Sequence, residues 1–222
     1  NKNIRNFLGK PLIAYTIEHA KECHLINRII VDTDSPKIAA IARKYGAEVP
    51  FLRPKRLSGY RARVDDAIYY TLRRLEREEN YRPTHFVLLQ ATSPLREPGD
   101  VEECWKFIQR TDADTVLTVA PTHPKLYYLG RDKRLILVNK EKRRSENIQE
   151  WRPAYLLNGC VVYIVKTAAF LRERKVFTKN IRAVISPKWR SVDLDTLEEW
   201  AIAEVIYKNR RAIARRIKRM SR

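Results

Sequence analysis

Apolar and polar residues alternate along this chain with two different periods. After Pro11, apolar residues at positions 12, 13, 17 and 20 follow the spacing of a helix, and residues 63–79 form a strongly amphipathic helical pattern. Short continuous apolar runs between the helical stretches are typical of buried strands. The expected helices cover 11–23, 36–46, 63–79, 100–109, 167–171 and a long segment from 196, and the expected strands cover 28–31, 48–52, 85–89, 115–119, 161–165 and 182–185.

This succession of elements predicts the fold class. A strand followed by a helix, repeated along the chain, is typical of an α/β domain whose mostly parallel sheet carries helices on both faces. With 222 residues, of which 44% are hydrophobic, the chain is long enough for one well-buried domain of this kind. No internal repeat or low-complexity linker divides it, so we expect residues 1–222 to form a single domain.

The alternation breaks between Pro121 and Leu157. This stretch is polar, basic and aromatic, and the segments 126–130 and 134–138 are possible strands of a hairpin. A stretch of this length without regular structure in a compact domain commonly has a task, such as a lid or an interface. We therefore expect residues 121–157 to leave the sheet as an excursion of the same domain.

Composition limits the cellular setting and the partners. No run of eighteen apolar residues could span a membrane, and no secretory signal pattern opens the chain, so we expect a cytoplasmic protein without a membrane partner. The three cysteines, Cys23, Cys104 and Cys160, lie far apart and lack the spacing of zinc ligands. They are expected to be buried thiols rather than disulfides or metal ligands.

The net charge of +19 is large for a domain of this size. It is compatible with binding of nucleic acid, with a charged surface of the kind found in thermally adapted proteins, or with attraction of small polyanions such as nucleoside triphosphates. Much of the excess lies in residues 210–222, where Ile213 and Ile217 have helical spacing. A solvated basic helix end is the simplest interpretation, and contact with nucleic acid is a less favoured alternative.

Polar residues follow several expected strands, at 32–35, 90–96, 158–159 and 193–195. In open α/β sheets, ligands bind beyond the carboxyl ends of the strands. Asp193 and Asp195 alternate on a segment expected to be extended, so both carboxylates can face one side and suit Mg²⁺. The alternative is that Asp195 caps the final helix, in competition with Thr196. A similar pair at 32 and 34 is better explained by ordering the start of the following helix.

Seven short segments carry a more specific resemblance. They are 2–12 (KNIRNFLGKPL), 28–35 (RIIVDTDS), 44–49 (KYGAEV), 51–54 (FLRP), 88–96 (LLQATSPLR), 158–159 (NG) and 192–196 (VDLDT) before 203–204 (AE). In order and spacing these segments resemble the CMP-sialic acid synthetase (acylneuraminate cytidylyltransferase) family across essentially the whole chain. Relative to that family, the strand and glycine- and serine-rich phosphate loop that precede the first segment are missing.

The resemblance implies a three-layer α/β/α, Rossmann-like nucleotidyltransferase fold and a homodimer held by the excursion at 121–157. It implies transfer of CMP from CTP to the anomeric hydroxyl of a sialic-acid-like nonulosonate, with release of pyrophosphate and with Mg²⁺ as cofactor. It also implies residue roles: Lys2 and Asn3 would contact CTP, Arg53 would lie near the nucleotide, Gln90, Thr92, Ser93, Arg96, Gln149 and Tyr163 would form the sugar site, and Asp193 and Asp195 would hold Mg²⁺, with Lys2 joining them in catalysis.

Several positions depart from the family pattern. The family often has an acidic residue where Tyr60 stands and small hydroxyl residues near Val64, so the contacts to cytosine are expected to differ. Ile148 and Gln149 occupy a register where the family commonly has Arg-Gln, so another arginine, such as 143 or 144, could hold the sugar carboxylate. One extra residue precedes Tyr163, which a bulge could accommodate or which could turn its side chain elsewhere.

Other functions remain open at this point. The same reaction could act on legionaminate, pseudaminate or an octulosonate, although Asn158 and Gly159 favour a sialate- or legionaminate-like sugar. A nucleotidyltransferase acting on a sugar 1-phosphate has a related fold. From a different class, a basic nucleic-acid-binding protein could retain this fold without activity. No convincing side-chain base is found: His85 is expected to pack within or beside its strand, and His123 lies in the excursion.

Overall fold

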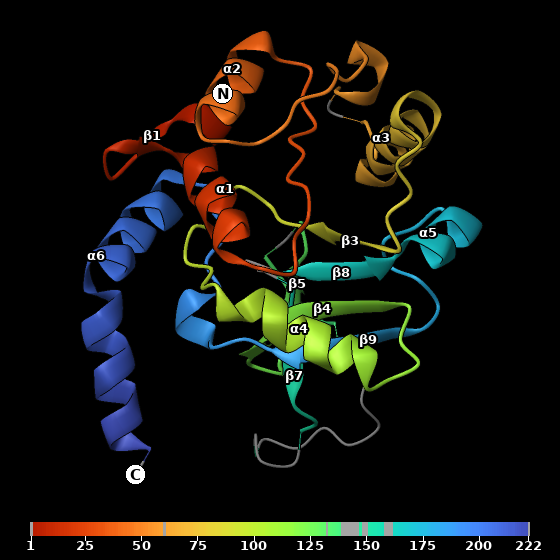
Figure 1. The fold of residues 1–222 in the computed structure, drawn as a ribbon. Coiled ribbons are helices and arrows are strands. Elements are labelled where there is room, and N and C mark those ends of the chain that lie inside the picture. The colour runs from red at the N-terminus through yellow and green to blue at the C-terminus, as the bar shows by residue number, and fades with distance from the viewer. Residues whose placement is uncertain are drawn as a thin grey trace.

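The computed structural model describes residues 2–59, 61–131, 133–138, 147, 151–157 and 162–221 (Figure 1). The long helices match the amphipathic stretches of the sequence to within about two residues. The helices are α1 (Leu12–Glu22), α2 (Pro36–Lys44), α3 (Val64–Glu79), α4 (Gly99–Gln109), α5 (Thr167–Glu173) and α6 (Leu197–Met220), with 3₁₀ turns at Lys2–Ile4, Lys55–Leu57 and Lys188–Arg190. The strands are β1 (Asn6–Phe7), β2 (Lys10–Pro11), β3 (His85–Leu88), β4 (Thr115–Thr122), β5 (Tyr127–Leu129), β6 (Leu135–Leu137), β7 (Ala154–Leu156), β8 (Tyr163–Lys166) and β9 (Ile181–Ile185).

The main sheet is mixed rather than uniformly parallel. Its strand order is β3-β8-β4-β7, and β9 also pairs with β4. β4 and β9 are parallel neighbours, whereas β8 runs antiparallel to both β3 and β4. Strands β3, β4 and β9 therefore share one direction, as the repeated strand–helix pattern predicts. The reversal of β8 was not expected. Among the described residues no helix lies between β4 and β8, so their connection is not the helical crossover that usually joins parallel strands.

Helices cover both faces of this sheet, which confirms the three-layer α/β architecture. On one face, Val116 and Ile164 pack with residues of α4 such as Cys104. On the other face, the neighbouring residues Leu117 and Val165 pack with residues of α3 and α5. Successive side chains of a strand point to opposite faces, so each strand contributes to both cores. This alternation explains why the strands appear in the sequence as continuous apolar runs.

Two expected strands are reduced to a single bridge. The runs at 28–31 and 48–52 meet only at the parallel bridge between Ile30 and Glu48. The amide of Val31 donates to the Glu48 carbonyl at 2.9 Å, and the amide of Glu48 donates to the Ile29 carbonyl at 2.7 Å. These segments run alongside each other as predicted, but in the described structure they add no longer strand to the main sheet.

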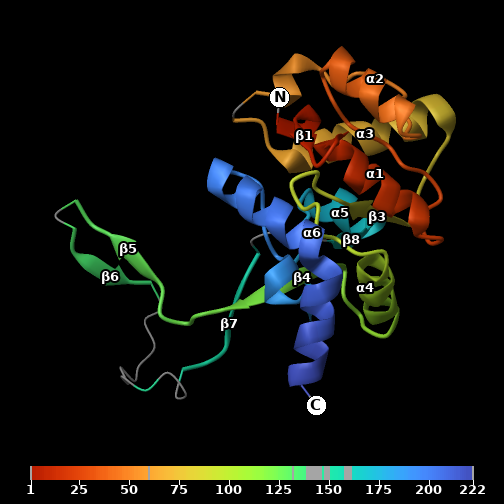
Figure 2. The same cartoon turned by 90° about the vertical axis from the view of Figure 1, so that its left-hand side faces the viewer.

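The excursion projects from the domain as a two-stranded hairpin (Figure 2). Strands β5 and β6 pair antiparallel with each other and form a sheet of their own, while β7 returns to pair with β4. Most apolar side chains of the hairpin are exposed: the exposed fraction is 66% for Tyr128, 67% for Leu129 and 64% for Leu135. Such a concentration of exposed apolar residues is typical of an interaction surface.

An aromatic cluster attaches α6 to the start of the chain. Phe7 is fully buried, and the rings of Tyr15, Trp200 and Tyr207 contact it edge-on, with centroids 5.2 to 5.7 Å away. Beyond Tyr207 the helix extends away from the domain (Figures 1 and 2). Among the described residues, no helix is both long and apolar enough to cross a bilayer.

Candidate active site

The loop after β3 is held by a buried arginine. The side chain of Arg96 donates to the carbonyl of Gln90 at 3.0 Å and to the hydroxyl of Thr16 at 3.3 Å. Arg96 is 2% exposed, whereas Gln90 is exposed. Arg96 therefore fixes the path of the loop from inside, and the Gln90 side chain remains accessible to a ligand. This arrangement fits the expected role of Arg96 in shaping a pocket.

The loop lies directly against the segment with the two aspartates. The amide of Leu194 donates to the carbonyl of Thr92 at 3.1 Å, and the Leu194 side chain is fully buried. The segment was expected to be extended, but the amide of Asp195 donates to the carbonyl of Asp193 at 3.1 Å, so the chain makes a tight three-residue turn here. Residues about 100 positions apart in the sequence thus meet at one edge of the sheet.

Thr196, not Asp195, caps helix α6. The Thr196 hydroxyl accepts from the amide of Glu199 at 3.2 Å, and the Glu199 carboxylate accepts from the amide of Thr196 at 2.8 Å, which completes a capping box. The hydrogen bond from the Thr196 amide is the main reason why the pKa of Glu199 is lowered. The capping alternative for Asp195 is thereby removed, and its carboxylate is free for another role.

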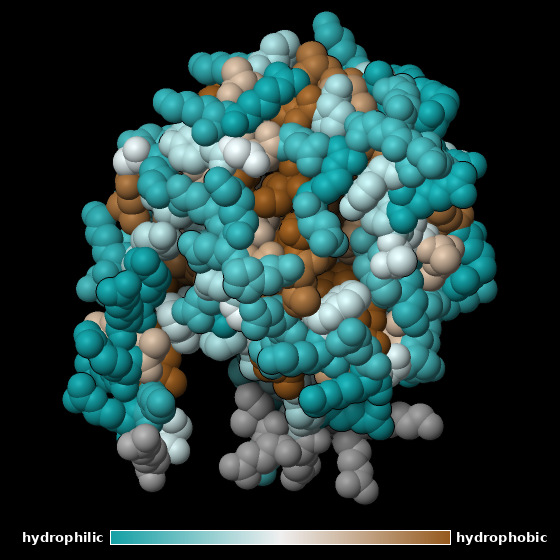
Figure 3. Space-filling model, in the orientation of Figure 1, coloured by the Kyte–Doolittle hydropathy of each residue, from teal (hydrophilic) through white to brown (hydrophobic). Residues whose placement is uncertain are grey.

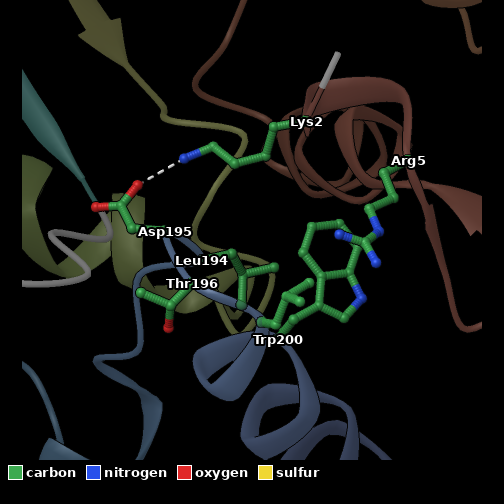
Figure 4. Close-up of a pocket in the computed structure, with 7 residues that line it drawn as sticks. Lys2, Arg5, Leu194, Asp195, Thr196 and Trp200 are labelled. Atoms are coloured by element: carbon green, nitrogen blue, oxygen red, sulfur yellow. Dashed lines mark hydrogen bonds and ion pairs between the residues drawn. The ribbon is translucent and has the colours of Figure 1, made fainter.

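Asp195 and Lys2 meet in an open pocket of about 470 Å³ (Figure 4). The Lys2 ammonium donates to Asp195 Oδ1 at 2.6 Å, and the side chains are 40% and 65% exposed. Arg5 lies over the Trp200 ring on the other side of the pocket, with its guanidinium carbon 4.9 Å from the ring centroid. The pocket thus presents two cations and one carboxylate to solvent.

Asp193 supplies a second carboxylate next to this pocket. Its Oδ1 atom is buried and accepts no hydrogen bond from any described residue. A buried carboxylate oxygen without a partner is costly, and a bound cation would satisfy it. Magnesium in nucleotide enzymes commonly binds one or two carboxylates together with substrate phosphates. Asp193 and Asp195 fit that chemistry, although the described residues contain no group of three or more His, Cys, Asp or Glu side chains able to hold a metal by themselves.

Arg53 is not among the residues that line this pocket. Its guanidinium donates to Asp32 at 3.2 Å and to the hydroxyl of Ser58 at 3.0 Å, and it is about one-fifth exposed. Burial raises the pKa of the Asp32 carboxyl, and the Arg53 charge opposes that rise. As expected, the residue that caps the nearby helix α2 is Ser35, whose hydroxyl accepts from the amide of Ile38 at 3.4 Å.

Of the remaining predicted site residues, one lies beside the pocket, two are buried, and the others lie outside the described residues. Asn3 lies beside Lys2 in the first 3₁₀ turn, and Ser93 is buried in the loop after β3 with its hydroxyl unpaired among the described residues. Tyr163 is 7% exposed and packs edge-on against Phe177, so its ring belongs to the core. Residues expected at or near the site that lie outside the described residues are Gln149, Asn158, Gly159, Tyr60, Arg143, Arg144 and Ile148.

Arg5 and Trp200 line the pocket, although no motif in the sequence assigned a role to either of them. Arg5 belongs to the segment 2–12 that carries the family resemblance, and Trp200 sits one turn into α6 after the DLD motif. A lysine and an arginine three residues apart at the start of a chain rich in cations do not stand out. Only the contact of α6 with the first residues brings these side chains together.

Comparison with known proteins identifies the family of this chain. A family model for cytidylyltransferases matches residues 1–182. A pseudaminic acid cytidylyltransferase of Campylobacter jejuni subsp. jejuni serotype O:23/36 is 30% identical over 93% of this chain and 89% of its own length. An N-acylneuraminate cytidylyltransferase of Escherichia coli O18:K1:H7 is 31% identical over 96% of this chain, which corresponds to 50% of that relative.

A solved structure supports the fold. A CMP:2-keto-3-deoxy-manno-octonic acid synthetase complexed with CTP superposes with a TM-score of 0.66, covering 94% of this chain and 92% of the other. At 13% sequence identity, this likeness shows the fold alone. The family model and the two sequence relatives go further, because each of them spans most of this chain. The chain belongs to the cytidylyltransferase family, as its resemblance to CMP-sialic acid synthetases predicted, and it is a nucleotidyltransferase.

Proposed function

We propose that this protein transfers CMP from CTP to the anomeric hydroxyl of a sialic-acid-like nonulosonate and releases pyrophosphate. The observation that carries the proposal is the contact between the Lys2 ammonium and the Asp195 carboxylate, in a pocket beside the loop that presents Gln90. Family membership supports the same reaction. The anomeric hydroxyl attacks the α-phosphorus in line, the bond to the β-phosphate oxygen breaks, and the hydroxyl proton is released.

The chain's own residues would act mainly by position and charge. Both substrates are anions, so cations must offset their repulsion before they can meet. In this proposal the ammonium of Lys2 neutralises charge on the triphosphate as it moves onto pyrophosphate, Asn3 and Arg53 contact the nucleotide, and the Gln90 amide orients the sugar. Thr92 and Ser93 belong to the wall of the sugar site, and Arg96 fixes that wall.

Magnesium, held by Asp193 and Asp195, would supply neutralisation of phosphate charge and increase the acidity of the attacking hydroxyl. The unpaired Oδ1 of Asp193 supports this assignment. Among the described histidines, none is an obvious general base. His85 packs edge-on against Trp105, and burial lowers its pKa, while His123 Nδ1 accepts a hydrogen bond from the amide of Lys125.

The identity of the sugar stays a prediction. The relatives quoted above act, by their names, on pseudaminic acid and on N-acylneuraminate. Their sequence identities to this chain, 30% and 31%, are nearly equal and therefore do not favour one sugar over the other. Of the two residues that favour sialate or legionaminate, Asn158 and Gly159, neither is among the described residues. Legionaminate, pseudaminate and octulosonate are therefore the alternatives within this reaction class.

We further propose that the hairpin β5–β6 mediates a homodimer. Tyr127, Tyr128, Leu129, Leu135 and Ile136 are 48% to 67% exposed, and a two-stranded hairpin in water has little stability of its own. A second copy would cover these side chains and stabilise the hairpin. Gln149 stays a predicted sugar contact, whereas Tyr163 is not proposed as one, because its ring packs in the core. The cytoplasmic location of the enzyme also stays a prediction.

One experiment separates the candidates. The purified protein is incubated with CTP, Mg²⁺ and one of N-acetylneuraminate, legionaminate, pseudaminate, an octulosonate or a sugar 1-phosphate, and pyrophosphate release is measured together with the mass of the product. We expect a CMP-linked nonulosonate, formed fastest from the sialate or legionaminate. Preference for the sugar 1-phosphate would contradict the proposed substrate class. Absence of turnover and of CTP binding would instead favour a protein that retains the fold without activity.

A further inference from the structure

The free half of α6 carries an unusual concentration of unpaired cations. From Val205 to Ser221 the chain contains seven Lys or Arg residues and no Asp or Glu. The Arg210 side chain donates to the Tyr207 carbonyl at 2.6 Å and lies over its ring. The side chains of the other six make no hydrogen bond or ion pair within the part of the chain that the structure describes; they are Lys208, Arg211, Arg215, Arg216, Lys218 and Arg219.

Four of these six cations share one face of the helix. Lys208, Arg211, Arg215 and Arg219 recur every three or four residues, which places them along one face of a helix. Ile206, Ile213 and Ile217 follow the same spacing along the opposite face. Figure 3 shows the free half of α6 standing apart from the body, with hydrophobic residues toward the hollow beneath the domain and hydrophilic residues along its outer side. The cationic face therefore points to solvent.

The position of this face argues against a role in attracting CTP. The pocket with Lys2 and Asp195 lies at the N-terminal end of α6, and Arg211 is fourteen residues beyond Leu197. At a rise of 1.5 Å per residue, that separation is about 21 Å along the helix axis. Charges on the surface are screened over about 8 Å at physiological ionic strength. The cations between positions 211 and 219 thus have little influence on a ligand in the pocket.

We propose that the outer face of α6 is a contact surface for the phosphate backbone of nucleic acid, bound without regard to base sequence. The four cations of this face, from Lys208 to Arg219, occupy about 17 Å of helix, or roughly one per 4 Å. Each strand of duplex DNA presents one phosphate charge per about 3.4 Å, so the two linear charge arrays are of comparable density. Three of the four are arginines, whose guanidinium groups suit phosphate oxygens geometrically.

An anionic membrane is a weaker match to the same helix. A helix that lies on a bilayer buries its apolar face among the acyl chains. Here the isoleucine face is turned toward the hollow beneath the domain, and the outer face is hydrophilic (Figure 3). Ile217 on the apolar face is 45% exposed, but this face looks toward the hollow, where the body of the domain stands in the way of a flat bilayer. A rod-like polyanion requires only the outer face. The sequence alone favoured a solvated basic helix end. That interpretation changes because the helix projects from the domain and carries four cations on its outer face.

The test compares two triple variants of the full chain that lose the same charge. The first, Arg211→Gln/Arg215→Gln/Arg219→Gln, removes cations of the outer face. The second, Lys37→Gln/Lys44→Gln/Lys106→Gln, removes three exposed cations from helices α2 and α4. Glutamine is a good helix former, so both variants should retain their helices, which circular dichroism checks. Binding to a fluorescein-labelled 20-base-pair duplex of mixed sequence is measured by anisotropy at several salt concentrations.

We expect the α6 variant to bind the duplex at least tenfold more weakly at 0.1 M salt. Its slope of log K against log salt should be shallower by about 2.7, because three phosphate contacts contribute about 0.9 each. The α2/α4 variant should change affinity less than threefold, and cytidylyl transfer should be the same in both variants. Equal weakening in the two variants would overturn the proposal, since a diffuse charge effect would then suffice.

Two further results would also overturn it. One is arginine-dependent binding to vesicles of phosphatidylglycerol and phosphatidylcholine without any binding to the duplex, which would identify a lipid surface. The other is a change of oligomeric state in the α6 variant without duplex binding by the parent protein, which would identify a second copy of the chain as the partner. Duplex binding with the expected salt slope, lost only in the α6 variant, would establish the proposed surface.

Discussion

The ammonium of Lys2 lies 2.6 Å from the carboxylate oxygen Oδ1 of Asp195, although 193 positions separate these residues in the sequence. Both side chains are partly exposed, so this ion pair contributes little to stability, at most about 1 kcal/mol. The pair matters for chemistry rather than for stability. When ligands bind, Lys2 can pair with a phosphate in place of Asp195, and Asp195 can bind a divalent cation in place of Lys2.

The first prediction concerns Asp195→Asn. Loss of the carboxylate charge should lower the turnover of CTP on the order of 100-fold or more, since charge placed at the reacting phosphates commonly contributes that much. The melting temperature should change by less than about 4 °C, because only an exposed ion pair is lost. Asp112→Asn is the matched control, since Asp112 is exposed and pairs with Arg182 at 3.5 Å. Full turnover in Asp195→Asn would rule out its assignment to the metal and catalytic set.

The second prediction separates Gln90 from Arg96. Gln90→Ala should raise the KM for the sugar about 2- to 10-fold, the loss of one hydrogen bond, and leave the KM for CTP and the melting temperature unchanged. Arg96→Met should, unlike Gln90→Ala, lower the free energy of unfolding, by about 1 to 3 kcal/mol. It removes the buried guanidinium that donates hydrogen bonds to the Gln90 carbonyl and the Thr16 hydroxyl. Steady-state kinetics and urea unfolding measure both effects. An equal loss for both substrates in Gln90→Ala would contradict its role at the sugar.

A third prediction tests the hairpin. We expect the protein to sediment as a dimer and Leu129→Asp/Ile136→Asp to sediment as a monomer, since buried carboxylates without partners oppose association. The monomer should keep its melting temperature to within a few degrees, because these side chains are 67% and 51% exposed within one chain. Leu25→Asp serves as control, as Leu25 is also exposed, at 42%, but lies outside the hairpin. A dimeric double variant would place the interface elsewhere.

The buried ion pair between Asp100 and Arg190 gives a fourth prediction. The two hydrogen bonds measure 2.6 and 2.8 Å, and both residues are less than 10% exposed. Asp100→Ala should lower the free energy of unfolding by about 3 to 5 kcal/mol, because it removes both short hydrogen bonds of the buried Arg190 charge and leaves Glu97, at 3.8 Å, as a more distant acidic neighbour. Removing both charges in Asp100→Leu/Arg190→Met should recover part of this loss. Urea unfolding measures both, and a double variant less stable than Asp100→Ala would contradict the explanation.

His19 provides a prediction about pH. Burial, reinforced by the charge of Arg96, lowers its pKa from 6.5 to about 4. Between pH 6.5 and 4 the unfolded chain therefore binds a proton that the folded chain excludes, so His19 stabilises the fold above pH 6.5 and this contribution is lost as the pH falls toward 4. The loss is on the order of 3 kcal/mol.

Urea unfolding at pH 7 and pH 5 checks this dependence. His19→Gln should flatten the decrease in stability between the two pH values, whereas His24→Gln, which alters an exposed histidine, should leave it unchanged. If both variants keep the slope of the parent protein, other groups control the acid sensitivity.

Much of the fold could be predicted from periodicity alone. Helices α1, α3 and α4 coincide with amphipathic stretches, and the hairpin strands were expected from the two short apolar runs at 126–130 and 134–138. The direction of β8 could not be predicted in this way, since an apolar run has the same pattern whether its neighbours are parallel or antiparallel. The lengths of the strands expected at 28–31 and 48–52 were overestimated for a related reason. A local pattern of apolar residues does not determine how many residues of a segment form hydrogen bonds with a neighbouring strand.

For the candidate site, too, the sequence predicted which residues take part but not how they are arranged. Its main residues were named from motifs, because Gln90, Asp193 and Asp195 follow expected strands, and Lys2 lies in a segment typical of the family. Whether Asp195 caps a helix or faces a pocket depended on a hydrogen bond between Thr196 and Glu199. The burial of Tyr163 in the core could not be predicted either, since it depends on the helices that cover that face of the sheet.

By itself, the sequence determined the α/β class, the family and the set of polar residues from which the site is built, because these depend on local spacing and on residue identity. Tertiary structure alone decided that Lys2 meets Asp195, that Arg96 holds the Gln90 loop from within, and that the second half of α6 projects away from the domain. The contacts of Lys2 and Arg96 join segments far apart along the chain. They arise from how helices and sheet pack together, which no local pattern of residues encodes.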